Sequence, residues 1–189
     1  MIAGTAQIED AAVTETMIQA LSRLFRYNLK STASVMPLER ELKVVQDYMY
    51  LQQMRFGKRV RYETDCAPET MEILVPSFML QPLVENAVKH GISARSKGGR
   101  IVVRTWKQGQ RLWISVADTG EGIDEDKLEK IKRALKEGDG SGVGIGLGNI
   151  ARRLKAMYED GEVRIESRKG CATVVQLAFT PENCKEDEP

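Results

Sequence analysis

Two stretches in the first third of the chain repeat with the period of a helix. The first stripe falls at three- or four-residue spacing on Val13, Met17, Leu21, Leu24 and Asn28. The second has the same period on Leu38, Leu42, Val45, Met49, Gln52 and Phe56. A small-residue loop from Ser31 to Pro37 separates them, so the pattern predicts a helical hairpin ending near Gly57. Such a short pair leaves apolar surface uncovered, which favours packing on the following domain or pairing with a second hairpin.

Beyond Arg59 the pattern changes to short strands interspersed with helices. Strands are expected at 60–64, 72–74, 100–106, 111–118, 162–168 and 172–179. We expect Ser77 to cap a helix that ends at Gly91, and Asp124 to cap a helix over 126–136, with a last helix over 150–158. These elements predict an α+β fold, a two-layer sandwich whose mostly antiparallel sheet is covered by helices. The hairpin takes residues 1–57, this domain 58–181 and an acidic tail 182–189.

Composition excludes several classes of protein. The 189 residues carry 28 basic and 27 acidic side chains, a net charge of +1, so no broad field points to nucleic acid as a partner. No apolar run approaches the roughly 18 residues of a membrane span. Cys66, Cys171 and Cys184 lie far apart, which fits reduced thiols in a cytoplasm, and the single histidine excludes a multi-histidine metal site.

Four polar residues lie at the end of an otherwise apolar helix: Glu85, Asn86, Lys89 and His90. Because these four residues recur at helical spacing, we expect them all to point to one side of the helix. An amide oxygen is a hard ligand for Mg²⁺, and an amine can meet phosphate charge. The group therefore suits a metal-bound polyphosphate, and a solvated helix face is the alternative interpretation.

A second polar cluster follows a strand directly. Asp118 is succeeded by Gly120 and Gly122, whose missing side chains let the backbone come close to a ligand. A carboxylate there can accept a hydrogen bond from the exocyclic amine of adenine, whereas guanine presents an oxygen at the equivalent place. Taken alone, this motif is also compatible with an ordinary turn between strand and helix.

The third cluster is a glycine-rich run in front of the last helix. Glycines and apolar residues alternate in it: Gly142, Val143, Gly144, Ile145, Gly146 and Leu147. Free backbone N–H groups next to a helix N-terminus form a cradle for an anion. The run lacks the GK[ST] of a P-loop and the position of a Rossmann fingerprint. A linker is the alternative, although linkers rarely interleave apolar residues so regularly.

In this order the clusters resemble the nucleotide-binding domain shared by histidine kinases, gyrase-type topoisomerases, heat-shock chaperones and mismatch-repair ATPases. Three segments narrow the resemblance: VPSFMLQPLVENAVKHGI, LFRYNLKSTASVMPLERELKVVQDYMYLQQMRFGKRVRYE and GVGIGLGNIARRL. They are similar to LytS/YehU-type sensor histidine kinases over about residues 19–179. The resemblance implies a Bergerat-type ATP-binding fold and a protein-histidine kinase of a two-component system.

The resemblance also implies roles for the helix cluster. Asn86 would be the Mg²⁺ ligand, and Glu85 would polarise or orient the transfer. Lys89 and His90 would lie along the phosphates of ATP.

In the other two clusters, Asp118 would hold the adenine amine. Gly120, Gly122 and Ile123 would form the turn of the pocket. The glycine-rich run would hinge a mobile lid, roughly 124–141, and contact the phosphates through Gly142, Gly144, Ile145, Gly146 and Leu147.

One departure from the family concerns the phosphoacceptor. Its members keep that histidine in an NPHFLFN-like segment upstream of the hairpin, and this chain has none. The resemblance therefore implies a cytoplasmic part of a longer bacterial membrane sensor, which binds ATP, serves a response regulator and dimerises through the hairpin. As a fragment it is expected not to phosphorylate itself, because His90 lies inside the expected nucleotide site.

Two other functions fit the same nucleotide fold. One is a serine kinase of the anti-sigma type, which needs no upstream histidine. The other is a non-catalytic module that binds ATP only to change its shape and its affinity for a partner. The helical hairpin, whose RYNL and LQQMRFG segments are similar to sensor kinases, favours the histidine kinase.

Overall fold

A five-stranded sheet with the order β2-β4-β5-β7-β6 forms one layer of the molecule. The computed structural model describes residues 11–30, 35–92, 95, 97–137 and 145–182. The strands are β2 Val60–Cys66, β4 Gly99–Gln108, β5 Arg111–Asp118, β6 Glu162–Arg168 and β7 Ala172–Phe179. β2 runs parallel to β4 and the other neighbours pair antiparallel. The predicted mostly antiparallel α+β architecture is confirmed.

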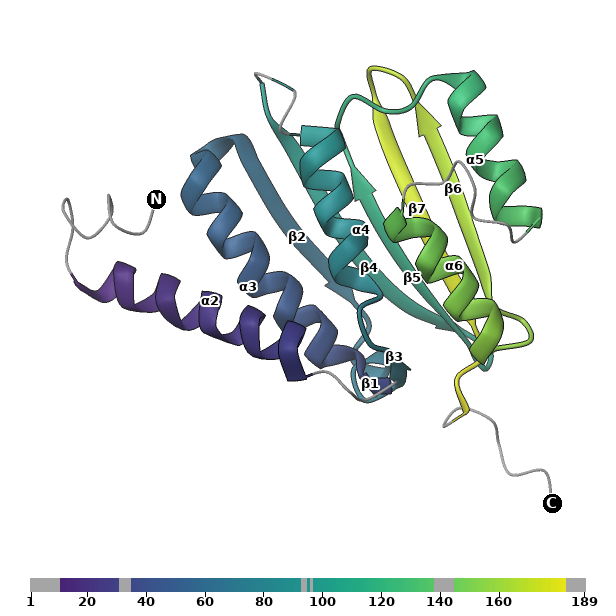
Figure 1. Ribbon diagram of the computed structural model, residues 1–189, viewed down its shortest axis with the longest axis horizontal. Coiled ribbons are helices and arrows are strands. Elements are labelled where there is room, and N and C mark those ends of the chain that lie inside the picture. The colour runs from purple at the N-terminus through teal and green to yellow at the C-terminus, as the bar shows by residue number, and fades with distance from the viewer. Residues whose placement is uncertain (1–10, 31–34, 93–94, 96, 138–144, 183–189) are drawn as a thin grey trace.

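Helices form the second layer on one face of this sheet (Figure 1). Those over the sheet are α3 Leu38–Phe56, α4 Leu80–Asn86 and α6 Ile145–Met157. α2 (Ala11–Lys30) flanks α3 on its outer side, and α5 (Glu125–Glu137) lies beside β6 at the other end. Short turns follow α3 (η1, Gly57–Arg59) and β2 (η2, Pro68–Thr70), and a π-helical segment, η3 (Ala87–Ile92), continues α4.

The alternation of residues along the strands explains why only one face carries helices. Leu112, Ile114 and Val116 of β5 point toward the helices and are buried in the main core. On the opposite face Trp113 stacks on Trp106 of β4, with 5.8 Å between the ring centroids. The guanidinium groups of two arginines lie over Trp113, so this face is closed by long polar side chains rather than by another layer.

The hairpin helices differ in how they join the domain. α3 packs into the main core through Leu38, Val45 and Met49, whereas α2 has a separate small cluster on the outer side of α3. The two helices are also joined by Arg23, whose Nε and Nη2 donate to the buried Asp47 carboxylate at 2.6 and 2.8 Å. α3 is therefore an integral part of the domain, and α2 is attached to it.

Four local expectations differ from the structure, the first being the strand expected at 72–74, which lies at Leu74–Pro76. The segment expected as a loop before α3 ends in strand β1 (Val35–Pro37), which pairs antiparallel with β3 (Leu74–Pro76) apart from the main sheet. α6 begins at Ile145, inside the glycine-rich run, and not at residue 150. Ser77 is not the N-cap of α4: Met79 occupies that position, and the carboxylate of Glu41 accepts the first backbone N–H groups.

Within the described part of the chain, no helix combines the length and the apolar character needed to cross a membrane.

Replacing Arg23 by Met should loosen α2, because it leaves the buried Asp47 carboxylate without its bidentate partner. We expect the free energy of unfolding to fall by about 1–3 kcal/mol and amide hydrogen exchange to accelerate in residues 11–30 but not in the sheet. Arg26→Met, at an exposed position of the same helix, is the control. Unchanged exchange in α2 would show that the ion pair does not hold this helix.

Candidate functional site

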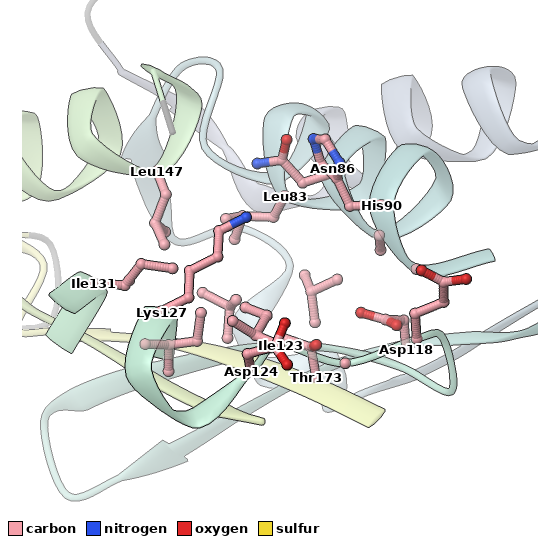
Figure 2. Close-up of a pocket in the computed structure, with 17 residues that line it drawn as sticks. Leu83, Asn86, His90, Asp118, Ile123, Asp124, Lys127, Ile131, Leu147 and Thr173 are labelled. Carbon is pink, nitrogen blue, oxygen red and sulfur yellow. The ribbon is translucent and has the colours of Figure 1, made fainter. Parts of the chain in front are cut away.

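A cavity of about 390 Å³ lies between the sheet and the helices α4 and α5. Figure 2 shows Asn86 and His90 on one side of it, Asp118 at the sheet and Lys127 on the opposite wall. Its sheet side is lined by apolar residues, among them Val116, Ile165 and Val175. A cavity of this size, with an apolar side and several polar groups, suits a small organic ligand that also carries polar groups.

Asp118 ends β5 and brings a carboxylate to the apolar part of the cavity. Its side chain is buried, with the residue 7% exposed, and its Oδ1 accepts a hydrogen bond from the Gly120 N–H at 2.8 Å. Burial raises the pKa of Asp118 from 3.8 to about 6, and the Gly120 hydrogen bond opposes this only partly. At neutral pH the carboxylate is thus ionised at a cost, and a ligand that donates a hydrogen bond to it reduces that cost.

The surroundings of Asp118 depend on two glycines that approach each other closely. A Cβ on Gly91 would lie 2.4 Å from Asp118 Oδ1, and a Cβ on Gly120 would lie 2.1 Å from Gly91 Cα. No side chain fits at either position, because contacts under 3 Å force the backbone apart. Gly91, at the end of the helix cluster, therefore has a steric role that its place in the sequence did not reveal.

Asn86 and His90 lie one turn apart where α4 passes into η3, and both line the cavity. π-helical segments of this kind often occur at functional sites. Glu85 and Lys89, which we expected on the same side of the helix as Asn86 and His90, do not line the cavity. Glu85 accepts a hydrogen bond from Gln81 Nε2 at 2.7 Å and acts electrostatically on Tyr48 of α3, so it faces α3.

The turn after Asp118 is held by contacts with the β6–β7 hairpin. Gly122 has a φ of 64°, and a Cβ there would lie 2.1 Å from the carbonyl oxygen of Arg168. The N–H of Ile123 donates to Ser167 Oγ at 2.9 Å, and Ile123 lines the cavity. Of the predicted pocket turn, Gly122 and Ile123 therefore line the cavity, and Gly120 lies against Gly91, which also lines it.

Only part of the glycine-rich run can be placed. Gly142 and Gly144 lie outside the described residues, and Ile145 is the first residue of α6. Leu147 lines the cavity, and a Cβ on Gly146 would lie 3.5 Å from Asn86 Nδ2. The described start of α6 thus lies beside the residue that the sequence singled out as a metal ligand.

Much of the segment expected as a lid is a helix packed on the domain. Residues 125–137 form α5, in which Leu128, Ile131, Ala134 and Leu135 are buried in the main core. Lys155 of α6 donates from its Nζ to the carbonyl oxygens of Leu135 and Lys136 at the end of α5. These contacts hold this part of the expected lid in the fold, and residues 138–144 lie outside the described structure.

Several cavity residues had no predicted role in the site, and the polar ones among them are Glu121, Asp124, Lys127 and Thr173. Lys127 of α5 extends its amine toward the wall that carries Leu83 and Asn86 (Figure 2). Thr173 lies opposite Asp118 in the pairing of β5 with β7 and also lines the cavity. Lys127 is one of several lysines on a charged helix, and Thr173 is identified only through strand pairing, so neither has a signal in the sequence alone.

The side chains present also limit how a metal ion could be bound. Among the residues that the structure describes, no group of three or more His, Cys, Asp and Glu side chains could hold a metal ion. A dedicated all-protein cage is therefore not formed by the described residues. Mg²⁺ that arrives with a polyphosphate needs only one or two protein oxygens, and the half-buried amide of Asn86 can supply one.

Comparison with known proteins identifies the family. A model described as histidine kinase-, DNA gyrase B- and HSP90-like ATPase matches residues 76–183, and a histidine kinase model matches residues 1–60. The chain is 36% identical to the sensor protein LytS of Staphylococcus saprophyticus over 83% of this chain and 26% of that protein. It is 35% identical to the sensor histidine kinase YpdA of Escherichia coli over 77% of this chain and 25% of that protein.

A solved structure agrees at the level of the fold. The histidine kinase domain of the Erythrobacter litoralis EL346 blue-light activated kinase matches 92% of this chain and 81% of that domain, with a TM-score of 0.57 and 18% identity. The chain spans only about a quarter to a third of the length of its curated relatives. The matches favour the histidine kinase over the serine kinase and the non-catalytic module. The chain therefore belongs to the sensor histidine kinases, and residues 76–183 are its ATPase domain of the histidine kinase, DNA gyrase B and HSP90 type.

Proposed function

We propose that the cavity binds Mg²⁺–ATP and presents its γ-phosphate to a histidine outside these 189 residues. The observation that carries this function is the division of the cavity, with a buried carboxylate, Asp118, among apolar residues and Asn86, His90 and Lys127 on the helix walls. An adenine ring needs the first environment, and a charged polyphosphate needs the second.

The Asp118 part of the cavity supplies base recognition. The ionised carboxylate accepts a hydrogen bond from the adenine amine, while the apolar residues of β5, β6 and β7 contact the ring. Guanine would place a carbonyl oxygen against the carboxylate, so the site selects adenine by repulsion as well as by attraction.

Asn86, His90 and Lys127 supply the phosphate part. Bound Mg²⁺ would neutralise phosphate charge, with the Asn86 amide oxygen as its protein ligand. Lys127 pairs with a phosphate oxygen, and His90 donates a hydrogen bond along the chain of phosphates. In the transfer, the bond between the γ-phosphorus and the oxygen of ADP breaks and a bond from phosphorus to an imidazole nitrogen forms, while that imidazole loses its proton.

The acceptor is a histidine of another segment or another molecule. The chain has a single histidine, His90, which lines the nucleotide cavity itself and so lies beside the phosphates rather than in line behind the γ-phosphate. This chain alone then binds ATP without phosphorylating itself. The phosphohistidine would pass its phosphate to a response regulator, in the cytoplasm, where ATP is available.

The hairpin supplies a surface for a homodimer of the full-length protein. Ile18, Phe25 and Leu29 of α2 lie at seven- and four-residue spacing, and the exposed fractions of Phe25 and Leu29 are 58% and 80%. An apolar stripe of this kind on an attached helix is typical of a seam between paired helices.

Asp118→Asn should weaken adenine nucleotide binding and at the same time stabilise the unliganded protein. We expect ADP affinity in calorimetric titrations to fall by about 1–3 kcal/mol, because a charge-assisted hydrogen bond is lost. GDP should bind weakly to both proteins. Unchanged ADP affinity would remove Asp118 from the adenine site.

The stability effect of this variant has a definite pH dependence. The folded-state pKa of Asp118 is raised from 3.8 to about 6, so the ionised form destabilises the fold at pH 7. Lowering the pH from about 6 toward 4 protonates the folded state first and relieves this cost. Urea unfolding should therefore show Asp118→Asn more stable than wild type by about 1–2 kcal/mol at pH 7, with the difference vanishing near pH 4.

Asn86→Ala should remove the effect of Mg²⁺ on nucleotide affinity, because it deletes the protein oxygen that the metal would use. ADP affinity measured in EDTA should stay within about twofold of wild type. Titration with and without Mg²⁺ separates these effects. A wild-type gain from Mg²⁺ that survives in the variant would exclude Asn86 as the ligand.

Lys127→Met should weaken ADP and ATP by about 1 kcal/mol without changing the affinity for adenosine, because only the phosphates meet the amine. Lys130→Met, at an exposed position of the same helix that does not line the cavity, is the control. Equal losses for adenosine and ADP would contradict a phosphate contact.

A further inference from the structure

A buried carboxylate joins the hairpin to the helix that carries Asn86. Glu41 of α3 is 1% exposed, and its Oε1 accepts the Phe78 N–H at 2.9 Å. Its Oε2 accepts the N–H groups of Met79 and Leu80, each at 3.0 Å. These are the N–H groups that the first turn of a helix leaves without intrahelical partners, and α4 has no capping side chain of its own. The carboxylate needs donors and the helix end needs an acceptor, so each compensates the burial of the other.

α2 takes part in the same contact through Tyr27. The Tyr27 hydroxyl donates to Glu41 Oε1 and accepts the Phe78 N–H at 2.7 Å. Its ring packs on the Phe78 ring with 4.4 Å between centroids. Burial and the Glu41 charge both raise the pKa of Tyr27, which keeps the hydroxyl protonated and able to donate. Residues of α2, α3 and the start of α4 thus form one hydrogen-bonded group.

The backbone at this point is held in an uncommon conformation. Phe78 has a φ of 60°, which non-glycine residues seldom adopt and which persists only where the surroundings impose it. On its other side the Ser77 carbonyl oxygen accepts from Arg153 Nη1 of α6. The entry to α4 is therefore set by contacts from α2, α3 and α6 and not by its own sequence.

The other end of this helix lies at the cavity. Asn86 is six residues beyond Leu80, about 9 Å along the axis at 1.5 Å per residue. Leu80, Leu83 and Val84 are buried, so the segment moves as a short packed rod. A change in the direction of its first turn therefore displaces the Asn86 amide.

We propose that Glu41 is a positioning residue for Asn86, and that through Tyr27 the docking of α2 sets how well the cavity binds metal-bound nucleotide. This inference rests on the proposed binding of Mg²⁺ and ATP. It adds that the hairpin and the nucleotide cavity are coupled within one chain, through a group of contacts that touches neither the nucleotide nor the metal.

Two variants separate this coupling from a general loss of stability. Tyr27→Phe deletes only the hydroxyl that reaches Glu41 and Phe78. Arg111→Met removes the ion pairs of Arg111 with Asp160 and Glu162 and deletes no hydrogen bond of α2 or α4. Glu41→Gln is the stronger variant, studied at a temperature at which circular dichroism shows it folded.

The experiment measures the ratio of ADP affinity with Mg²⁺ to that in EDTA. We expect Tyr27→Phe to reduce this ratio about threefold or more, with affinity in EDTA nearly unchanged, and Glu41→Gln to reduce it further. Arg111→Met should keep the wild-type ratio. A wild-type ratio in Tyr27→Phe, or equal reductions in Tyr27→Phe and Arg111→Met, would overturn the inference.

A measurement without ligand keeps the inference distinct from the proposed function. The side-chain amide resonances of Asn86 in the nucleotide-free protein should shift in Tyr27→Phe and not in Arg111→Met. Unshifted resonances in Tyr27→Phe would overturn the positioning role even if wild type binds Mg²⁺–ADP. Failure of wild type to bind ADP would overturn the proposed function and the coupling to metal-bound nucleotide with it.

Discussion

The contact between the Glu41 carboxylate and the first turn of α4 holds three helices, α2, α3 and α4, in one arrangement. The proposed function depends on this arrangement. α4 supplies Asn86 to the cavity, α3 supplies the carboxylate, and α2 adds the Tyr27 hydroxyl. An ionised side chain almost without exposure is costly unless several donors surround it. This requirement makes the arrangement specific, since a shift of any of the three helices leaves a buried charge or helix N–H groups unsatisfied.

Glu41 is buried with several hydrogen-bond donors, whereas the burial of Asp118 lowers the stability of the folded protein. Its carboxylate is buried beside apolar residues, with the Gly120 N–H as a partner, and its pKa is raised to about 6. The folded protein thus retains a group that destabilises it at neutral pH. Such a cost is typical of sites whose polar groups await a ligand, because the ligand supplies the missing hydrogen bond.

The sequence was most informative where a pattern is local. Alternation placed β5, β6 and β7 at their observed bounds, and the glycines after Asp118 correctly marked a turn at the cavity. The sequence was least informative where a residue contacts another that is far away along the chain. Ser77 looked like the cap of α4, while the acceptor came from Glu41, 39 residues before Leu80. Lys127 and Thr173 reached the cavity through helix packing and strand pairing, which leave no spacing to recognise.

The four polar residues at the end of α4, Glu85, Asn86, Lys89 and His90, also show what the sequence could and could not predict. Helical spacing predicted that all four would lie on one side, and the structure places only Asn86 and His90 at the cavity. The choice between the two sides depends on which face of α4 packs against α3, where Glu85 acts on Tyr48.

The sequence by itself therefore determined most of the elements, the family and three polar groups of the site, Asn86, His90 and Asp118, because periodicity and motif spacing are properties of neighbouring residues. Only the tertiary structure decided which groups meet, because burial, capping and strand pairing join residues that are far apart along the chain.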